Sequence, residues 1–166
     1  MSYIDFLSSV HKSTKRDYLA RVNDPEYPKA YAATLAKKWD FDYWDGSRKV
    51  NYGGYSYDGR WAKVAKAMVE HYGIKAGDKI LDIGCGKGFL LYDFMQVCPG
   101  VEVAGIDISS YAIENSLPEI RDRVSIGNAK NLPFEANEFD LVLSLTTLHN
   151  LYAQDLFPAL QEMERV

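Results

Sequence analysis

Short apolar runs alternate with helix-like stretches along residues 79–166. Helices are predicted over residues 88–97, from Ser109 and from Asp155. Pro158 then falls in the first turn of the last helix, where its missing N–H does no harm. Because repeated strand–helix units imply parallel strands with helices on both faces, an α/β, doubly wound sheet is predicted. Its four predicted strands are KILDI (79–83), VEVAGI (101–106), RVSI (123–126) and FDLVLSL (139–145).

The beginning of the chain has helical character. Residues 2–22 are predicted to form a helix in two pieces, with Ser13 or Thr14 as a cap for the second piece. The sequence NDPEYP (23–28) then stops that helix. Pro28 opens another predicted helix, which is rich in alanine and lysine.

Residues 40–59 lack a helical or strand period, so this stretch is predicted to be a loop. From Arg60 onward a helix is predicted that ends at Gly73. The apolar positions with helical spacing there are Trp61, Val64, Ala65, Met68 and Val69. We therefore expect a helical N-terminal cap with an aromatic lid loop over residues 1–59 and an α/β core over residues 60–166.

Charge is distributed unevenly along the 166 residues, whose overall composition is that of an ordinary globular chain. Residues 1–78 hold 13 Lys/Arg against 10 Asp/Glu, whereas residues 79–166 hold 6 against 13. Because phosphate binding draws on clustered Lys and Arg, no nucleic-acid partner is expected. No apolar run has the roughly 18 residues of a membrane span, and the first residues do not resemble a secretory signal, so a cytoplasmic protein is predicted.

The two cysteines, Cys85 and Cys98, have no metal-binding spacing and fit free thiols in a reducing compartment. No metal site is expected.

The sequence GCGKG (Gly84 to Gly88) stands where the first predicted strand turns into its helix. Ligands of such sheets lie beyond the carboxyl ends of the strands, and glycine allows a tight turn and a close approach. The spacing GxGxG differs from the GxGxxG of dinucleotide folds. Asp82, two residues before the first glycine, suggests that the ligand carries a cation.

A second acid supports the same interpretation. Asp107 lies 19 residues after Gly88, at the end of the second predicted strand, where a carboxylate can accept hydrogen bonds from both ribose hydroxyls. The two acids together predict a nucleoside ligand with an amino-acid tail.

Four stretches in this order resemble the class I S-adenosylmethionine (SAM)-dependent methyltransferases, and particularly their small-molecule, type 11-like branch. The resemblance covers residues 60–166. Residues 1–59 resemble the family only in that its members carry N-terminal caps of variable sequence. It implies a Rossmann-like sheet with strand order 3-2-1-4. The stretches are ILDIGCGKG, GIDIS (105–109), GNAKNLPF (127–134) and FDLVLSLTTLHN (139–150).

The resemblance also implies cofactor contacts. Asp82 and the amides of Gly84 and Gly86 would hold the methionine tail, and Asp107 would hold the ribose. Ile108 would pack on the adenine. The full implied set is Asp82, Gly84, Cys85, Gly86, Gly88, Asp107, Ile108, Asn128, Ala129, Ser144 and Leu145.

The remaining implied contacts come from the third and fourth strands. Asn128 stands where the family usually has Asp, and its side-chain oxygen can still accept from the adenine amino group. A turn-forming role explains Asn128 without any ligand. Ala129 would supply its backbone N–H, and Ser144 and Leu145 would line the pocket near the sulfonium.

His149 and Asn150 follow the fourth strand, beside the place where the family transfers the methyl group. His149 is a candidate general base, and the alternative is a histidine satisfied by backbone groups. Many methyl transfers need no base, because positioning supplies much of the rate.

Residues 39–61 hold eight aromatic side chains, and this stretch is interpreted as a lid over the donor. Tyr55 is a catalytic candidate, Tyr57 a cofactor contact, and Arg60 a partner for the methionine carboxylate. The alternative is that the aromatic side chains form the core of a cap.

The expected function is transfer of a methyl group from SAM to a small-molecule acceptor, with S-adenosylhomocysteine as product. Motifs of the DNA, glutamine and protein-arginine methyltransferases are missing after the fourth strand. Two alternatives remain: a non-catalytic SAM-binding protein or truncated remnant, and a nicotinamide-dependent oxidoreductase.

The sequence ends after the helix that follows the fourth strand, ahead of the family's fifth strand. An unpaired strand edge must be covered, so we expect pairing in a homodimer or cover from a rearranged N-terminal segment. Weak or absent activity is expected of this form.

Overall fold

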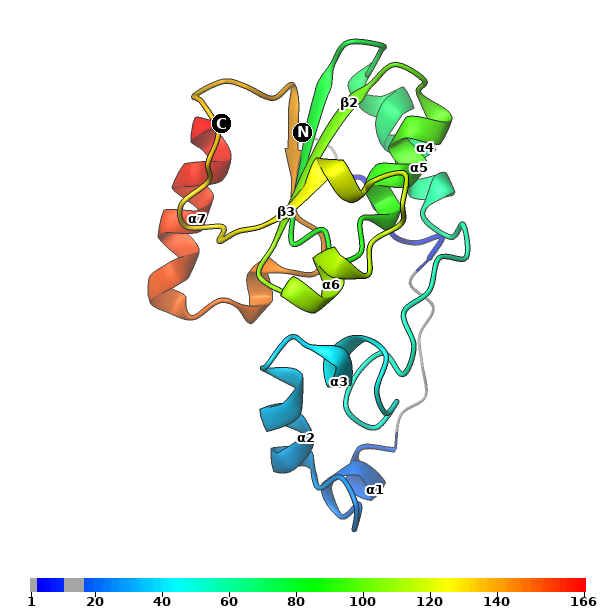
Figure 1. Cartoon of the computed structure of the whole chain (residues 1–166), viewed down its shortest axis with the longest axis vertical. Helices are drawn as coiled ribbons and strands as arrows, with labels where there is room; N and C mark the ends of the chain where they lie inside the picture. Colours follow the sequence, from blue (N-terminus) through cyan, green and yellow to red (C-terminus); the bar gives the residue numbers. More distant parts are fainter. Residues whose placement is uncertain (1–2, 11–16) are drawn as a thin grey trace. The chain divides into compact units, whose positions relative to one another are not determined.

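The computed structural model describes residues 3–10 and 17–166. The chain divides into two compact units, the sheet unit (residues 1–10 and 59–166) and the helical unit (residues 11–58) (Figure 1). The cap predicted at Ser13 or Thr14 lies outside the described residues.

The sheet unit contains four parallel strands in the order β3-β2-β1-β4, which confirms the predicted topology. Strand β1 is central: Asp82 is level with Gly105 of β2 and with Leu143 of β4. The carboxyl ends of the four strands therefore meet at one edge. The strands are β1 (Lys79–Ile83), β2 (Glu102–Asp107), β3 (Val124–Ile126) and β4 (Leu141–Leu143).

Helices cover both faces of this sheet (Figure 1). Alternate side chains of β1 point to opposite faces, so Ile80 joins one hydrophobic cluster with α4 and α5, whereas Leu81 joins another with α7. Two buried layers hold β1 in place. The helical elements of this unit are α4 (Ala62–Tyr72), α5 (Phe89–Val97), α6 (Ser110–Glu114), α7 (Ala153–Arg165) and the 3₁₀ turns η1 (Arg121–Arg123) and η2 (Leu148–Asn150).

The helix predicted from Arg60 is confirmed as α4, and Gly73 ends it in the left-handed conformation. The helix predicted from Asp155 starts earlier, at Ala153. Tyr152 accepts the first backbone bonds of the helix, from the N–H groups of Asp155 and Leu156. The prediction that Pro158 lies in the first turn is therefore wrong, because this proline is the sixth residue of α7.

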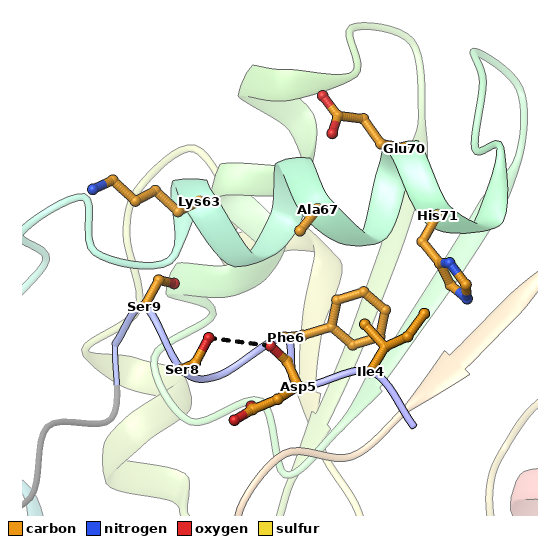
Figure 2. Close-up of a pocket in the computed structure, with 9 residues that line it drawn as sticks. All are labelled: Ile4, Asp5, Phe6, Ser8, Ser9, Lys63, Ala67, Glu70 and His71. Atoms are coloured by element: carbon orange, nitrogen blue, oxygen red, sulfur yellow. Dashed lines mark hydrogen bonds between the residues drawn. The ribbon is translucent and has the colours of Figure 1, made fainter. Parts of the chain in front are cut away.

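The first piece of the helix predicted over residues 2–22 is also wrong, because residues 3–5 have no regular structure and residues 6–10 form turns. The Asp5 carboxylate accepts the N–H of Leu7 at 2.9 Å, a local bond that competes with helix formation. Figure 2 shows this segment running beside α4. A cleft with a volume of about 460 Å³ is lined by residues of both. Phe6 packs against the ring of His71 with centroids 5.5 Å apart.

β4 pairs with β1 alone among the described strands, and residues 3–10 form no strand beside it. The segment that leads into β4 is held by the end of α7: the N–H groups of Asn137 and Phe139 donate to the carbonyls of Arg165 and Val166 at 2.8 and 2.9 Å.

The helical unit contains α1 (Tyr18–Val22), α2 (Lys29–Ala36) and α3 (Phe41–Trp44). The α2 helix begins directly after Pro28, as predicted. Residues 40–59 are not entirely loop, because Asp40 caps the short helix α3 by accepting the N–H of Asp42.

Candidate functional site

The turn Gly84–Gly88 joins β1 to α5 at the carboxyl edge of the sheet. Gly84, Gly86 and Gly88 all have positive φ, between 56° and 82°, which side-chain-bearing residues rarely adopt. A Cβ on Gly84 would lie 2.0 Å from the hydroxyl oxygen of Thr147. The first glycine is therefore required by both the backbone conformation and the close approach of the segment after β4.

Asp82 lies buried in β1, with only 4% of its surface exposed. Its Oδ1 atom has no hydrogen-bond partner among the described residues. Burial and the neighbouring negative charge of Asp107 raise the pKa of the Asp82 carboxyl to about 8. This side chain is thus an unsatisfied acid beside the glycine turn, at the place predicted for it.

Asp107, at the end of β2, is 8% exposed and is tied into the protein by both oxygens. Its Oδ2 accepts the N–H of Gly86 at 2.8 Å, and its Oδ1 accepts the N–H of Ser109 at 2.8 Å. Burial raises the pKa of Asp107, and these backbone donors oppose that shift. Asp107 therefore connects the glycine turn to the start of α6.

The amides of Gly84 and Gly86 are already engaged within the sheet unit. The N–H of Gly84 donates to the carbonyl of Ile106 at 2.7 Å, as does that of Cys85 at 3.2 Å. The N–H of Gly86 donates to Asp107. These donors shape the turn, and Gly88 completes it as the residue before α5.

The side chains expected around an adenine come from the ends of β2 and β3. Ile108 is 59% exposed, an unusual position for an isoleucine directly after a buried strand. Asn128 is exposed, and its side-chain oxygen accepts the N–H of Lys130 at 3.1 Å, so a turn-forming role is present. Ala129 is buried in the cluster that contacts α7.

The segment after β4 approaches the glycine turn. The Ser144 hydroxyl donates to the carbonyl of Ile83 at 2.7 Å, and Leu145 packs against the α4–α5 cluster. The Thr147 hydroxyl lies 3.4 Å from the carbonyl of Gly84. His149, in η2, is exposed at the surface of this segment.

Tyr55 and Tyr57 belong to the helical unit, whereas Arg60 is an exposed residue of the sheet unit just before α4. Tyr55 packs on the rings of Trp44 and Tyr52, with centroids 5.4 and 4.5 Å apart. Tyr55 therefore takes part in an aromatic core of the helical unit. Tyr57 is exposed.

Two residues at this site were not selected from the sequence. Lys87, in the middle of the glycine turn, is only 6% exposed, and its ammonium lies 5.8 Å from the centre of the Tyr111 ring. Thr147 makes the contact that excludes a side chain at Gly84. The unusual lysine within GCGKG was visible in the sequence, whereas the Thr147 contact depends on the fold.

Over residues 3–10 and 17–166, no three His, Cys, Asp or Glu side chains are grouped to hold a metal ion. In that same part of the chain, no helix has the length and apolar character needed to cross a membrane.

Comparison with known proteins identifies the family. A family model described as a methyltransferase domain matches residues 81–166, a little over half of the chain. A demethylmenaquinone methyltransferase of Symbiobacterium thermophilum is 36% identical over 101 residues, which are 56% of this chain and 40% of that protein. One from Staphylococcus aureus is 35% identical over 106 residues, covering 61% of this chain and 43% of its own length.

Solved structures share the fold of the sheet unit. The YcgJ protein from Bacillus subtilis matches with a TM-score of 0.53 and 27% identity, over 61% of this chain and 44% of that one. A SAM-dependent methyltransferase from Aquifex aeolicus shares the fold, with a TM-score of 0.52 and 23% identity, over 61% of this chain and 57% of that one. The chain spans about two fifths of the length of the curated relatives that it matches. It belongs to the family of methyltransferase domains, and its fold is that of the class I enzymes that use S-adenosylmethionine as the methyl donor.

Proposed function

We propose that this chain binds SAM at the carboxyl ends of β1 and β2 and transfers its methyl group to a small-molecule acceptor. The observation that carries this proposal is the Asp82 carboxyl, which is buried with one oxygen unpartnered among the described residues. Buried polar atoms in folded proteins normally have a partner, because an unpaired one costs free energy. An ammonium group of a methionine tail is a partner of the right charge.

Other residues fit the rest of the cofactor. The Asp107 carboxyl accepts backbone N–H groups at both oxygens, and a carboxylate has about four lone-pair sites, so it retains acceptor capacity for a ribose hydroxyl. The exposed Ile108 side chain offers an apolar surface to an adenine ring. Asn128 also keeps acceptor capacity beyond its bond to Lys130.

The backbone N–H groups of Gly84 and Gly86 are already hydrogen-bonded, which limits the bonds that the turn can donate to a cofactor. Because both N–H groups already donate within the protein, a methionine carboxylate would have to share them or bind elsewhere. The proposal therefore rests on the two acids, and the glycines serve to hold the turn open.

Bound SAM supplies an electrophilic methyl group on its sulfonium. The role of the chain is to orient that group: Asp82 and Asp107 would fix two ends of one ligand, and Ser144 and Leu145 would border its centre. His149 is exposed after β4, and its imidazole is the candidate general base for an acceptor hydroxyl.

The curated relatives reported above are demethylmenaquinone methyltransferases. A demethylated naphthoquinol is therefore the first acceptor to test for this chain. A wider panel of small hydroxyl and amine acceptors should be assayed beside it.

Two measurements test the proposal. Calorimetric titration with S-adenosylhomocysteine should show one binding site, whereas NAD under the same conditions should show none. Methyl transfer from labelled SAM to the acceptor panel should then separate an enzyme from a non-catalytic binding protein. Absence of S-adenosylhomocysteine binding by a folded chain would reject the function, and binding without turnover of any acceptor would favour the non-catalytic alternative.

A further inference from the structure

Two buried carboxyl groups meet at the glycine turn, and their surroundings differ. Asp107 accepts two backbone N–H bonds, one on each oxygen, and these bonds favour its charged form. Asp82 is as deeply buried, and its Oδ1 has no donor among the described residues. Of this pair, Asp107 has hydrogen bonds that favour a negative charge, whereas burial and the neighbouring Asp107 disfavour a negative charge on Asp82.

The charged and titratable groups around Asp82 support this division. Asp107, on the neighbouring strand β2, disfavours a second negative charge. Cys85 in the turn is a buried thiol whose pKa is raised well above its usual value, so it brings no charge. The paired residues Leu141–Leu143 of β4 are not ionisable. Burial, followed by the negative charge of Asp107, is the cause of the raised Asp82 pKa.

We propose that a ligand ammonium binds at Asp82 in exchange for a proton, so that each binding event releases one proton from the Asp82 carboxyl to solvent. The exchange balances as a carboxylic acid plus an ammonium ligand giving a carboxylate–ammonium pair plus one free proton. This inference rests on the proposed function, because it takes the amino-acid tail of SAM or S-adenosylhomocysteine as the ammonium.

The direction of the pH dependence follows from the raised pKa of Asp82. Below pH about 8 the ligand-free carboxyl holds its proton, which the incoming cation must displace. Affinity should therefore rise with pH, by at most about tenfold per pH unit, until Asp82 is already ionised. At pH 6.5 the ligand's own amino group, with an ordinary pKa of about 7.7–8.0, is already protonated and does not mask the release.

Calorimetry in buffers of different ionisation enthalpy measures the number of protons directly. At pH 6.5 the titration of the full chain with S-adenosylhomocysteine should release about one proton per ligand bound. Methylthioadenosine, which keeps the nucleoside but lacks the amino-acid tail, should bind without release. Asp122→Asn, at an exposed acid, should behave like the unaltered chain, whereas Asp82→Asn should bind more weakly and release none.

The outcomes separate the two proposals. Binding of S-adenosylhomocysteine without proton release overturns the exchange and leaves the SAM function standing, whereas absence of binding overturns both. Proton release that persists in Asp82→Asn, or that methylthioadenosine also causes, assigns the proton to another group and rejects the inference.

A measurement on the ligand-free chain covers the case in which Asp82→Asn does not fold. A carboxyl whose pKa is raised in the folded state stabilises the fold below its ordinary pKa of 3.8, and that contribution is lost as pH rises toward about 8. The melting temperature of the unaltered chain should therefore fall across this range, and S-adenosylhomocysteine should raise it more at pH 8 than at pH 6. Equal ligand-induced shifts at the two pH values would contradict the exchange.

Discussion

The turn after β1 and the segment after β4 lie at the same edge of the sheet, and they are built differently. In the turn, Cys85 to Gly88 are buried, and the amides of Gly84 and Gly86 are bonded to groups at the end of β2. In the segment, Thr146 has a positive φ of 56° without being glycine, and His149 and Asn150 are exposed.

Under the proposed function, this difference would separate two tasks. The turn is confined, because the N–H groups of Gly84 and Gly86 are bonded and a Cβ on Gly84 or Gly88 would lie within 3 Å of another side chain, which suits a ligand that never changes. A segment with exposed polar side chains can vary without disturbing the core, which suits the recognition of an acceptor. Substitutions in the turn should therefore weaken SAM binding, and substitutions in the segment after β4 should leave SAM binding intact.

The largest effect is expected for Gly84→Ala. A left-handed alanine costs about 1–2 kcal/mol and overpacking against Thr147 about 1–3 kcal/mol, so the unfolding free energy should fall by about 2–5 kcal/mol. Gly73→Ala is the matched control, because Gly73 has a φ of +68° and open space around its Cβ position. Urea denaturation of both variants gives the comparison. Equal losses of unfolding free energy in Gly84→Ala and Gly73→Ala would show that the contact with Thr147 does not restrict the turn.

Asp107→Ala should come next. The substitution removes an acceptor of two backbone bonds and the proposed ribose contact, and a hydrogen bond to a charged group contributes about 1.5–3 kcal/mol. Affinity for S-adenosylhomocysteine should fall at least tenfold in calorimetry, with some loss of stability. Asp122→Ala, at an exposed acid, should change neither. Unaltered affinity in a folded Asp107→Ala chain would place the ribose elsewhere.

A smaller loss is expected for Ile108→Ala. Because the Ile108 side chain is exposed in the ligand-free chain, its truncation should leave the melting temperature unchanged. Burial of the Ile108 side chain against the adenine ring should contribute about 1 kcal/mol to the binding free energy, which corresponds to a roughly fivefold change in affinity. Leu160→Ala, at an exposed apolar residue of α7, serves as the control. A stability loss without an affinity loss would mean that Ile108 is a packing residue.

The smallest effect on SAM binding is expected for His149→Ala, because His149 is exposed in the segment after β4. S-adenosylhomocysteine affinity should stay within about twofold, since exposed substitutions usually cost less than about 0.5 kcal/mol. If His149 is the general base, methyl transfer should fall by about 10²-fold or more. Unchanged transfer would assign His149 to the surface and leave positioning as the source of the rate.

The elements of the sheet unit could be predicted because their signals are local and strong. KILDI and the glycine turn specify β1 and its ligand edge, and Ser109 caps α6 as a helix start should. The first piece of the helix predicted over residues 2–22 failed because Phe6, Leu7 and Val10 pack against the α4–α5 cluster from a turn, a tertiary effect that spacing alone does not reveal.

The acids of the site could be located from the sequence, whereas their bonding could not. The position of Asp107 relative to GCGKG follows from strand and helix lengths, and both acids are found at the carboxyl edge. That Asp107 would take the N–H of Gly86, and that Thr147 would press on Gly84, depends on angles between chain segments far apart in the sequence. Whether a carboxyl oxygen of Asp82 or Asp107 has a hydrogen-bond partner is therefore decided by the fold.

The most direct test is a crystal structure of the chain with S-adenosylhomocysteine at saturating concentration. The ligand's ribose hydroxyls should lie within hydrogen-bond distance of Asp107, its amino group beside Oδ1 of Asp82, and its adenine on Ile108. A ligand bound away from the carboxyl ends of β1 and β2, with both carboxyl groups unchanged, would contradict the proposed donor site.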